Sequence, residues 1–186
     1  MTALWVLLGV VVVLGVAVAV SYNRFVSQRN LVQESWRQVD VELKRRHDLI
    51  PNLVETVKGY ATHEREVFDA VTRARATAAA PGSTPGEQAQ QEGVLGMALG
   101  RLFAVAEAYP DLKASTNFLE MQRELTETED RIAAGRRYYN ANVRALNTRV
   151  ESVPSNLVAS TFGFHKEEYF EVEDEAVRSA PSVDFT

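Results

Sequence analysis

The 186-residue chain has 20 Lys and Arg against 25 Asp and Glu, a net charge of −5, and no cysteine. Residues 1–150 carry 18 basic against 17 acidic side chains, whereas residues 151–186 carry 2 against 8. This distribution excludes a nucleic-acid-binding protein, which needs a concentrated basic face, and the composition excludes disulfides and thiol catalysis.

The N-terminal segment is an unbroken apolar run from Ala3 to Val20, and the first charged side chain is Arg24. Eighteen helical residues span roughly 27 Å, and the uncharged flanks extend the helix across a hydrocarbon core about 30 Å thick. We predict that residues 1–22 form a single membrane-spanning anchor and that residues 3–20 contact membrane lipid.

The alternative for this segment is a cleaved secretory signal, because Ala17-Val18-Ala19 resembles a cleavage site. No basic residue precedes the run, and the run exceeds the about 7 to 15 apolar residues usual in a signal peptide, so a retained anchor is favoured. Arg24, Arg29 and Arg37 follow the run, and the positive-inside rule therefore predicts an outside N-terminus and a cytoplasmic C-terminal domain.

Beyond the anchor, apolar residues recur at spacings of three and four, the period of one helix face. Within this predicted helix, Pro51 removes the hydrogen bond to the carbonyl of His47. Either the helix kinks there, or it breaks and Asn52 and Glu55 cap a second segment; the kink is favoured because the stripe keeps its phase. The stripe comprises Val32, Trp36, Val39, Leu43, Ile50, Val54, Val57, Ala61, Val67 and Val71.

A turn is predicted at residues 81–86, whose sequence is PGSTPG. Thr84 with Glu87 three residues later matches a capping box, and Pro85 suits the first helical position, so a helix begins there. We expect this helix to end at Tyr109-Pro110, because the residue before a proline avoids the α region.

The last long helix has a predicted cap at Asn117, with Glu120 three residues on, and is closed by Pro154. Its apolar residues repeat every seven positions, which indicates packing against neighbouring helices at a shallow angle. The fold class predicted is all-α: a transmembrane helix followed by an antiparallel up-and-down bundle of three to four long helices in residues 23–154. The repeat comprises Phe118, Leu125, Ile132, Tyr139 and Leu146, with Val143 and Val150 on a neighbouring row.

Residues 155–186 form an acidic tail that also contains Phe162, Phe164, Tyr169 and Phe170. Either these aromatic side chains strap the tail onto the bundle, or the tail is mobile. We predict a strap in the first half and disorder beyond Glu171.

Seven segments of the chain resemble the LemA family. The resemblance covers essentially the whole chain and implies a bacterial single-pass inner-membrane protein with an antiparallel helical bundle. Family members resemble components of magnetosome membranes or occur beside membrane proteases and signalling proteins, and no catalytic residue is carried over. The segments are 22–26 (YNRFV), 36–54 (WRQVDVELKRRHDLIPNLV), 57–61 (VKGYA), 107–114 (EAYPDLKA), 129–132 (EDRI), 137–140 (RYYN) and 183–185 (VDF).

The patterns of known catalytic and metal sites are incomplete in this chain. A carboxylate-bridged di-metal bundle needs Glu three residues before His on two helices, but Lys44, Tyr60 and Phe162 hold those positions. His63-Glu64 begins an H-E-x-x-H pattern whose second histidine is missing, so a surface histidine is favoured. We predict no catalytic residue, metal or cofactor, and a metal-dependent enzyme with an unrecognised site is the least favoured alternative.

The basic run at residues 44–47 (KRRH) is the best candidate for binding an anion such as a lipid head group. Arg46 and His47 also stand where the stripe calls for an apolar residue. Asp40 and Glu42 lie four residues before Lys44 and Arg46, and this acid-first spacing favours a solvated, salt-bridged face instead.

Glu129 and Arg136 fall on the row of the last helix that also holds Val143 and Val150. With Arg45, Arg46 and Asp48 they make a candidate ion-pair network, partly buried across two helices. Such a network either fixes the register of the helices or docks a partner, and register is favoured.

These patterns predict a non-enzymatic, membrane-anchored scaffold or interaction protein whose cytoplasmic bundle self-associates or docks another membrane protein. Gly15 and Ala19 form a small-x-x-x-small pair that suits close contact between two anchors, as in a homo-oligomer. The alternative is a regulatory partner of a membrane protease or signalling protein.

Overall fold

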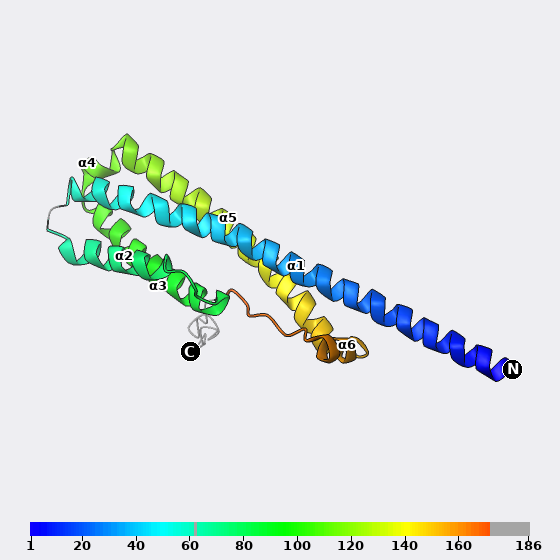
Figure 1. The fold of residues 1–186 in the computed structure, drawn as a ribbon. Helices are drawn as coiled ribbons and strands as arrows, with labels where there is room; N and C mark the ends of the chain where they lie inside the picture. Colours follow the sequence, from blue (N-terminus) through cyan, green and yellow to red (C-terminus); the bar gives the residue numbers. More distant parts are fainter. Residues whose placement is uncertain (62, 172–186) are drawn as a thin grey trace, which may run out of the picture. The chain divides into compact units, whose positions relative to one another are not determined.

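A computed structural model describes residues 1–61 and 63–171, and each regular element in that part of the chain is an α-helix (Figure 1). The predicted all-α class is therefore confirmed, whereas the up-and-down arrangement of the whole bundle stays a prediction. The helices are α1 (Thr2–Lys58), α2 (Arg65–Ala78), α3 (Pro85–Glu107), α4 (Pro110–Lys113), α5 (Thr116–Glu151) and α6 (Ser155–Phe162).

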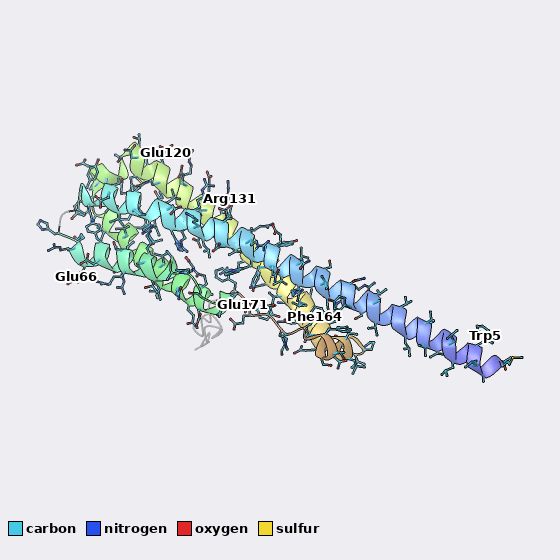
Figure 2. All side chains as sticks on the ribbon, viewed as in Figure 1. Trp5, Glu66, Glu120, Arg131, Phe164 and Glu171 are labelled. Atoms are coloured by element: carbon cyan, nitrogen blue, oxygen red, sulfur yellow. The ribbon has the colours of Figure 1, made fainter. Side chains whose placement is uncertain are left out.

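The first third of α1 carries the apolar run, and its side chains are exposed on all sides of the helix. Leu4, Trp5 and Val13 expose 69%, 70% and 67% of their surface, and Figure 2 shows Trp5 near the N-terminal end. Among the described residues, α1 alone is long and apolar enough to cross a membrane. A helix that is apolar all round and has no protein neighbour fits a lipid environment.

The path of α1 excludes one alternative and corrects one prediction. The helix continues through Pro51 and ends at Lys58, so the alternative of a break at the proline is wrong, and the favoured kink stays a prediction. The prediction that this helix reaches Val71 is also wrong, because the chain leaves it at Gly59 and re-enters a helix at Arg65. Glycine is about 1 kcal/mol less favourable than alanine within a helix and commonly follows a helix end.

The start of α3 follows the predicted capping box. Thr84 Oγ1 accepts a hydrogen bond from the Glu87 amide at 3.3 Å, and the Glu87 carboxylate accepts one from the Thr84 amide at 2.9 Å. Two of the amides that a helix start leaves without partners are thereby satisfied. The cap predicted at Asn117 is wrong, because α5 already begins at Thr116 and Asn117 lies in its first turn.

The seven-residue repeat of α5 is buried along its whole length, as predicted. Its members expose no more than 8% of their surface, and Val143 of the neighbouring row is fully buried, whereas Val150 is half-buried. The buried members are Phe118, Leu125, Ile132, Tyr139 and Leu146.

The chain forms two compact units. Unit 1 comprises Met1–Arg45 and Glu127–Tyr169, and unit 2 comprises Arg46–Thr126 with Phe170 and Glu171. These units divide the chain at points other than the predicted boundaries between anchor, bundle and tail, because α1 and α5 each contribute to both units.

In unit 1, α1 and α5 run antiparallel. Val39 Cγ2 lies 3.2 Å from the position that a Cβ on Gly135 would occupy, and the Trp36 and Tyr139 rings lie 5.2 Å apart. Glu42, further along α1, pairs with Arg131, which comes earlier on α5, at 3.8 Å. The missing side chain of Gly135 therefore lets the two backbones approach closely.

Unit 2 has its own apolar core, to which five helices contribute. α2 and α3 pack on each other, and the Phe103 and Phe118 rings meet edge to face at 6.3 Å. Burial of these side chains away from water is the main favourable term in folding this unit. The core includes Ile50, Leu53, Val54 and Val57 of α1, Phe68 and Val71 of α2, Leu95, Leu99 and Leu102 of α3, Leu112 of α4, and Phe118 and Leu125 of α5.

The segment that follows α5 begins with a helix, α6, which the sequence patterns did not predict. It ends at Gly163, whose φ of +71° lies in the left-handed region that favours glycine. Phe164 then packs against α1 with 6% of its surface exposed, so the predicted strap is confirmed for this residue. The disorder predicted beyond Glu171 falls on residues 172–186, which lie outside the described part of the chain.

Candidate functional site: a buried ionic cluster and an aromatic strap

The strongest concentration of buried polar side chains lies in unit 2, around Glu92 of α3. The side chains of Arg46, His47 and Glu92 expose only 8%, 8% and 6% of their surface, and Gln88 is buried beside them. We call these four residues the ionic cluster. Buried charges are costly unless paired and hydrogen-bonded, so their partners decide what the cluster can do.

Each oxygen of the Glu92 carboxylate is occupied by donors of the same unit. Oε2 accepts a hydrogen bond from Arg46 Nη1 at 3.0 Å, and Oε1 accepts one from Gln88 Nε2 at 2.9 Å. His47 Nε2 lies 2.7 Å from Oε1. Because an ionised carboxylate can only accept, the histidine ring donates through Nε2. Charge-assisted bonds of this kind are the strong ones in proteins, and they tie α1 to α3.

Arg75, which lies outside the ionic cluster, replaces the hydrogen bond that the His47 carbonyl loses because residue 51 is proline. Proline has no amide hydrogen, so the carbonyl of His47 lacks the donor that a helix normally supplies four residues later. Arg75 of α2 takes this role, because its Nε donates to His47 O at 2.6 Å. A partly buried carbonyl is thus satisfied by a side chain from another helix, and α1 continues without a break.

Replacing Arg75 by methionine is expected to lower the free energy of unfolding by about 1.5 kcal/mol, because the His47 carbonyl loses a charged donor. Adding Pro51→Ala restores a backbone donor at position 51, so the double variant should recover most of the loss. Urea unfolding followed by circular dichroism measures both effects. A double variant as unstable as Arg75→Met alone would contradict this role of Arg75.

The chemistry available to the ionic cluster is limited by its own hydrogen bonds. Three of the about four lone-pair sites of the Glu92 carboxylate are filled by protein donors, which leaves little capacity for a metal or a substrate proton. Within the described residues, His, Cys, Asp and Glu nowhere gather in a group of three suited to a metal ion. The hydrogen bonds of the cluster connect α1 to α3, and Gln88 Nε2 also donates to the Ala78 carbonyl at the end of α2 at 2.9 Å.

The structure corrects the interpretation of residues 44–47 as a solvated face. Arg46 and His47 are buried, whereas Lys44 and Arg45 are exposed. Glu42, the expected partner of Arg46, pairs instead with Arg131 at 3.8 Å. Spacing along one helix could not identify these pairs, because the stronger partner of Arg46 comes from α3.

The structure buries only one member of the predicted ion-pair network, which is Arg46. The exposed members are Arg45, Asp48, Glu129 and Arg136. Glu129 and Arg136 are exposed, so their assignment to a buried row of α5 is wrong. At 3.6 residues per turn, their positions lie beside the buried row rather than on it. Arg46 contributes to a buried ion pair, and its role in register stays an interpretation, as does partner docking by the exposed members.

Two residues of the ionic cluster, Gln88 and Glu92, were missed by the sequence patterns. They extend the apolar row of α3 backwards, since Gln88, Glu92, Leu95, Leu99 and Leu102 follow one another at spacings of three and four. A carboxylate in register with buried leucines is a signal of a buried ion pair. On α1 the corresponding signal was Arg46, which stands where the apolar stripe calls for an apolar residue.

A second cluster of contacts, the aromatic strap, holds Phe164 in unit 1. Its ring stacks on Phe25 with centroids 4.7 Å apart, Tyr22 approaches edge-on at 5.6 Å, and the Arg29 guanidinium lies 5.5 Å above the ring. Figure 2 labels Phe164 next to α6. Aromatic pairs and cation–π contacts add to the stabilisation that ring burial provides.

The backbone after Phe164 is held by side chains of α5. Asn147 makes two hydrogen bonds to Glu167, since its Nδ2 donates to the carbonyl and its Oδ1 accepts from the amide, both at 2.9 Å. The Tyr139 hydroxyl donates to the Glu168 carbonyl at 2.8 Å. These bonds satisfy backbone amide and carbonyl groups of an irregular segment, which has no helix or sheet hydrogen bonds of its own.

Burial of the Tyr139 ring, with the Glu167 and Glu168 carboxylates nearby, raises the pKa of its hydroxyl above the ordinary value of 10.0. A group whose pKa is higher in the folded state contributes stability that is complete below the unfolded pKa and is lost as pH rises through the folded value. We expect the stability advantage of wild type over Tyr139→Phe to be about 1 kcal/mol below pH 10. That difference should shrink above pH 10 in urea titrations, and a constant difference would contradict the hydrogen-bonded, protonated state.

In its described residues the chain is an all-helical protein with one candidate membrane-spanning helix, apolar cores and two clusters of buried polar and aromatic contacts. The chain belongs to the LemA family, since residues 35–185 match the model of that family.

Relatives of known name agree with this membership. The chain is 30% identical to Magnetosome protein MamQ 2 of Paramagnetospirillum magneticum, over 81% of this chain and 64% of that protein. It is 28% identical to Magnetosome protein MamQ of Magnetospirillum gryphiswaldense, over 80% and 64%. Protein LemA of Metamycoplasma hominis is 24% identical, over 82% of this chain and 69% of that protein. The chain thus spans less than two thirds of the length of the two MamQ relatives.

Proposed function

We propose that this LemA family protein is a non-enzymatic scaffold, anchored in the bacterial cytoplasmic membrane by residues 1–22, whose helical domain lies in the cytoplasm. There it self-associates or docks another membrane protein. The observation that carries the proposal is the continuity of α1, which runs without a break from the exposed apolar residues into buried positions such as Phe25, Val32 and Val39. A continuous helix couples the anchor mechanically to the domain.

The orientation rests on the charges that follow the apolar run. Arg24, Arg29 and Arg37 are exposed on the part of α1 that follows the run. Basic residues close to the end of a membrane span favour retention of that side in the cytoplasm.

The interaction role is supported by large apolar side chains that stay exposed outside the anchor. Val94 and Met97 are three residues apart on α3 and expose 53% and 65% of their surface, and Val41 of α1 exposes 64%. The non-enzymatic role is supported by the ionic cluster, where protein donors already occupy the Glu92 carboxylate. Exposed apolar side chains that recur on one helix face are common at protein contacts.

The orientation is tested with single-cysteine variants of the full chain, which has no native cysteine. In intact inner-membrane vesicles, Val41→Cys should react with a membrane-impermeant maleimide only when the cytoplasmic face is outside. Val13→Cys should stay unreactive in both orientations. Reaction of Val41→Cys from the outer face of whole cells would overturn the assignment.

The interaction role is tested by light scattering in detergent and by pull-down from native membranes. A defined oligomer supports self-association, and one stoichiometric membrane partner supports docking. Should that partner be a protease or signalling protein whose activity changes on binding, the regulatory alternative would replace the scaffold. A monomer without a partner, or a stoichiometric bound metal ion, would contradict the proposal.

A further inference from the structure

The helix α6 lies beside α1 at the place where the apolar run ends. Tyr22 follows the run by two residues, and its ring meets the Phe162 ring at the end of α6 edge to face, with centroids 5.0 Å apart. Phe164, just beyond α6, is 5.6 Å from the same tyrosine. All these residues belong to unit 1, and Figure 1 shows α6 next to α1.

The exposed side of α6 carries two large apolar side chains beside the polar Ser160 and Thr161. Leu157 and Phe162 expose 65% and 50% of their surface, and Val153, just before the helix, exposes 81%. Val158 and Ala159 are buried. At 3.6 residues per turn Phe162 projects between these two positions, so its ring packs on Tyr22 while half of its surface stays exposed. Large apolar side chains that stay exposed, such as those of Val153, Leu157 and Phe162, are unfavourable in water.

The sequence around α6 is also free of charge. From Ser152 to Phe164 there is no Asp, Glu, Lys or Arg, in a chain with 24% charged residues. Charged groups of both signs bound this stretch, since Glu151 precedes it and pairs with Lys166 beyond it. The Arg149 guanidinium lies 5.9 Å from the Phe25 ring, and the Arg29 guanidinium lies 5.5 Å from the Phe164 ring. Uncharged segments with aromatic side chains and nearby cations occur at the membrane–water interface.

We propose that α6 is an interfacial helix that lies on the bilayer which α1 crosses, with Val153, Leu157 and Phe162 in contact with lipid. This inference rests on the proposed anchoring of α1. The commitment to lipid rather than a protein follows from continuity, because the Tyr22–Phe162 contact joins α6 to the end of the span. Interfacial helices bury their apolar face about 5–10 Å deep, and a ring in direct contact with Tyr22 lies within that layer.

Such a contact would give unit 1 a second attachment to the membrane. A single spanning helix is free to tilt and rotate unless other anchors restrain it. Because the aromatic strap ties Phe164 back to Phe25 of α1, lipid contact at α6 would fix the angle at which α1 leaves the bilayer. The helical domain would then present the same side to its partner.

The test uses the full chain in vesicles of phosphatidylcholine and phosphatidylglycerol, with an NBD fluorophore on single cysteines. Leu157→Cys and Thr161→Cys report on the exposed face of α6, Val13→Cys reports on the anchor, and Val41→Cys is a matched exposed position on α1 beyond the interface. Nitroxides on lipid head groups or shallow acyl positions should quench positions 157 and 161. Aqueous iodide should quench these two at least about threefold less than position 41.

The outcomes separate the two proposals. If position 13 is not quenched by acyl-chain nitroxides, the anchor itself is wrong. If position 13 is quenched but positions 157 and 161 respond to iodide as position 41 does, only the interfacial role of α6 is overturned. Protection of 157 and 161 from both lipid and aqueous quenchers would assign the face to a protein instead and would also overturn it.

Discussion

Replacing Glu92 by alanine is expected to lower the free energy of unfolding by about 3 to 5 kcal/mol. The loss arises because Arg46 and His47, both buried, lose the carboxylate to which they donate, and Gln88 loses an acceptor. Urea unfolding of the full chain in detergent, followed by circular dichroism, measures the change.

A matched control is Glu120→Ala. This glutamate also lies on a helix near an arginine, with 3.9 Å to Arg123, but both side chains are about two-thirds exposed. Its loss should cost less than about 0.5 kcal/mol, since exposed pairs contribute little.

The coupling energy between Arg46 and Glu92 is measured with Arg46→Met, Glu92→Gln and the double variant. The stability loss of the double variant should be smaller than the sum of the two single losses by at least about 1 kcal/mol, because neither charge is left buried without its partner. Additive losses would show that the Arg46–Glu92 pair carries no energy of its own.

Replacing Phe164 by alanine is expected to release the aromatic strap from unit 1. The ring is 94% buried, stacked on Phe25 and covered by Arg29, so its loss should cost about 3 kcal/mol of local stability. The Glu167 amide, which donates to Asn147, should then exchange its hydrogen about 150-fold faster. Hydrogen exchange in detergent, with mass spectrometry of peptides covering residues 163–169, measures this rate.

The control for the strap is Phe162→Ala, which removes a ring that is half exposed. In detergent this variant should change exchange at Glu167 by less than about fivefold, because little buried surface is lost. Equal acceleration in both variants would mean that the strap is held by α6 rather than by the Phe164 ring.

Several features of the fold were predictable because they depend on neighbours in the chain. The capping box at Thr84 and Glu87 joins residues three positions apart, and the buried repeat of α5 follows from a fixed seven-residue period. The exposed apolar helix needs only composition and length. The groups of the capping box lie within one turn of each other, and the period of the α5 repeat can be counted along a single helix, so local sequence carries this information.

Other features were decided by contacts between segments far apart in sequence. The Arg46–Glu92 pair joins residues 46 positions apart, and the Arg75–His47 bond joins residues 28 apart. The helix end at Gly59 was hidden because the apolar stripe stays in phase across it. Glu129 and Arg136 were assigned to the wrong face because they share a seven-residue spacing with Val143 and Val150. Spacing alone does not show where along the helix that row turns away from its neighbours.

The sequence by itself determined that an apolar helix leads into an all-helical domain of the LemA family, because composition and period report directly on burial and helix geometry. Only the tertiary structure decided which charges are buried and where α6 meets the end of the apolar run. It also decided which donor satisfies the His47 carbonyl, which Pro51 leaves without a backbone donor. Those outcomes depend on which helices face each other, and the energies of the competing pairings differ too little along a single helix for local spacing to choose among them.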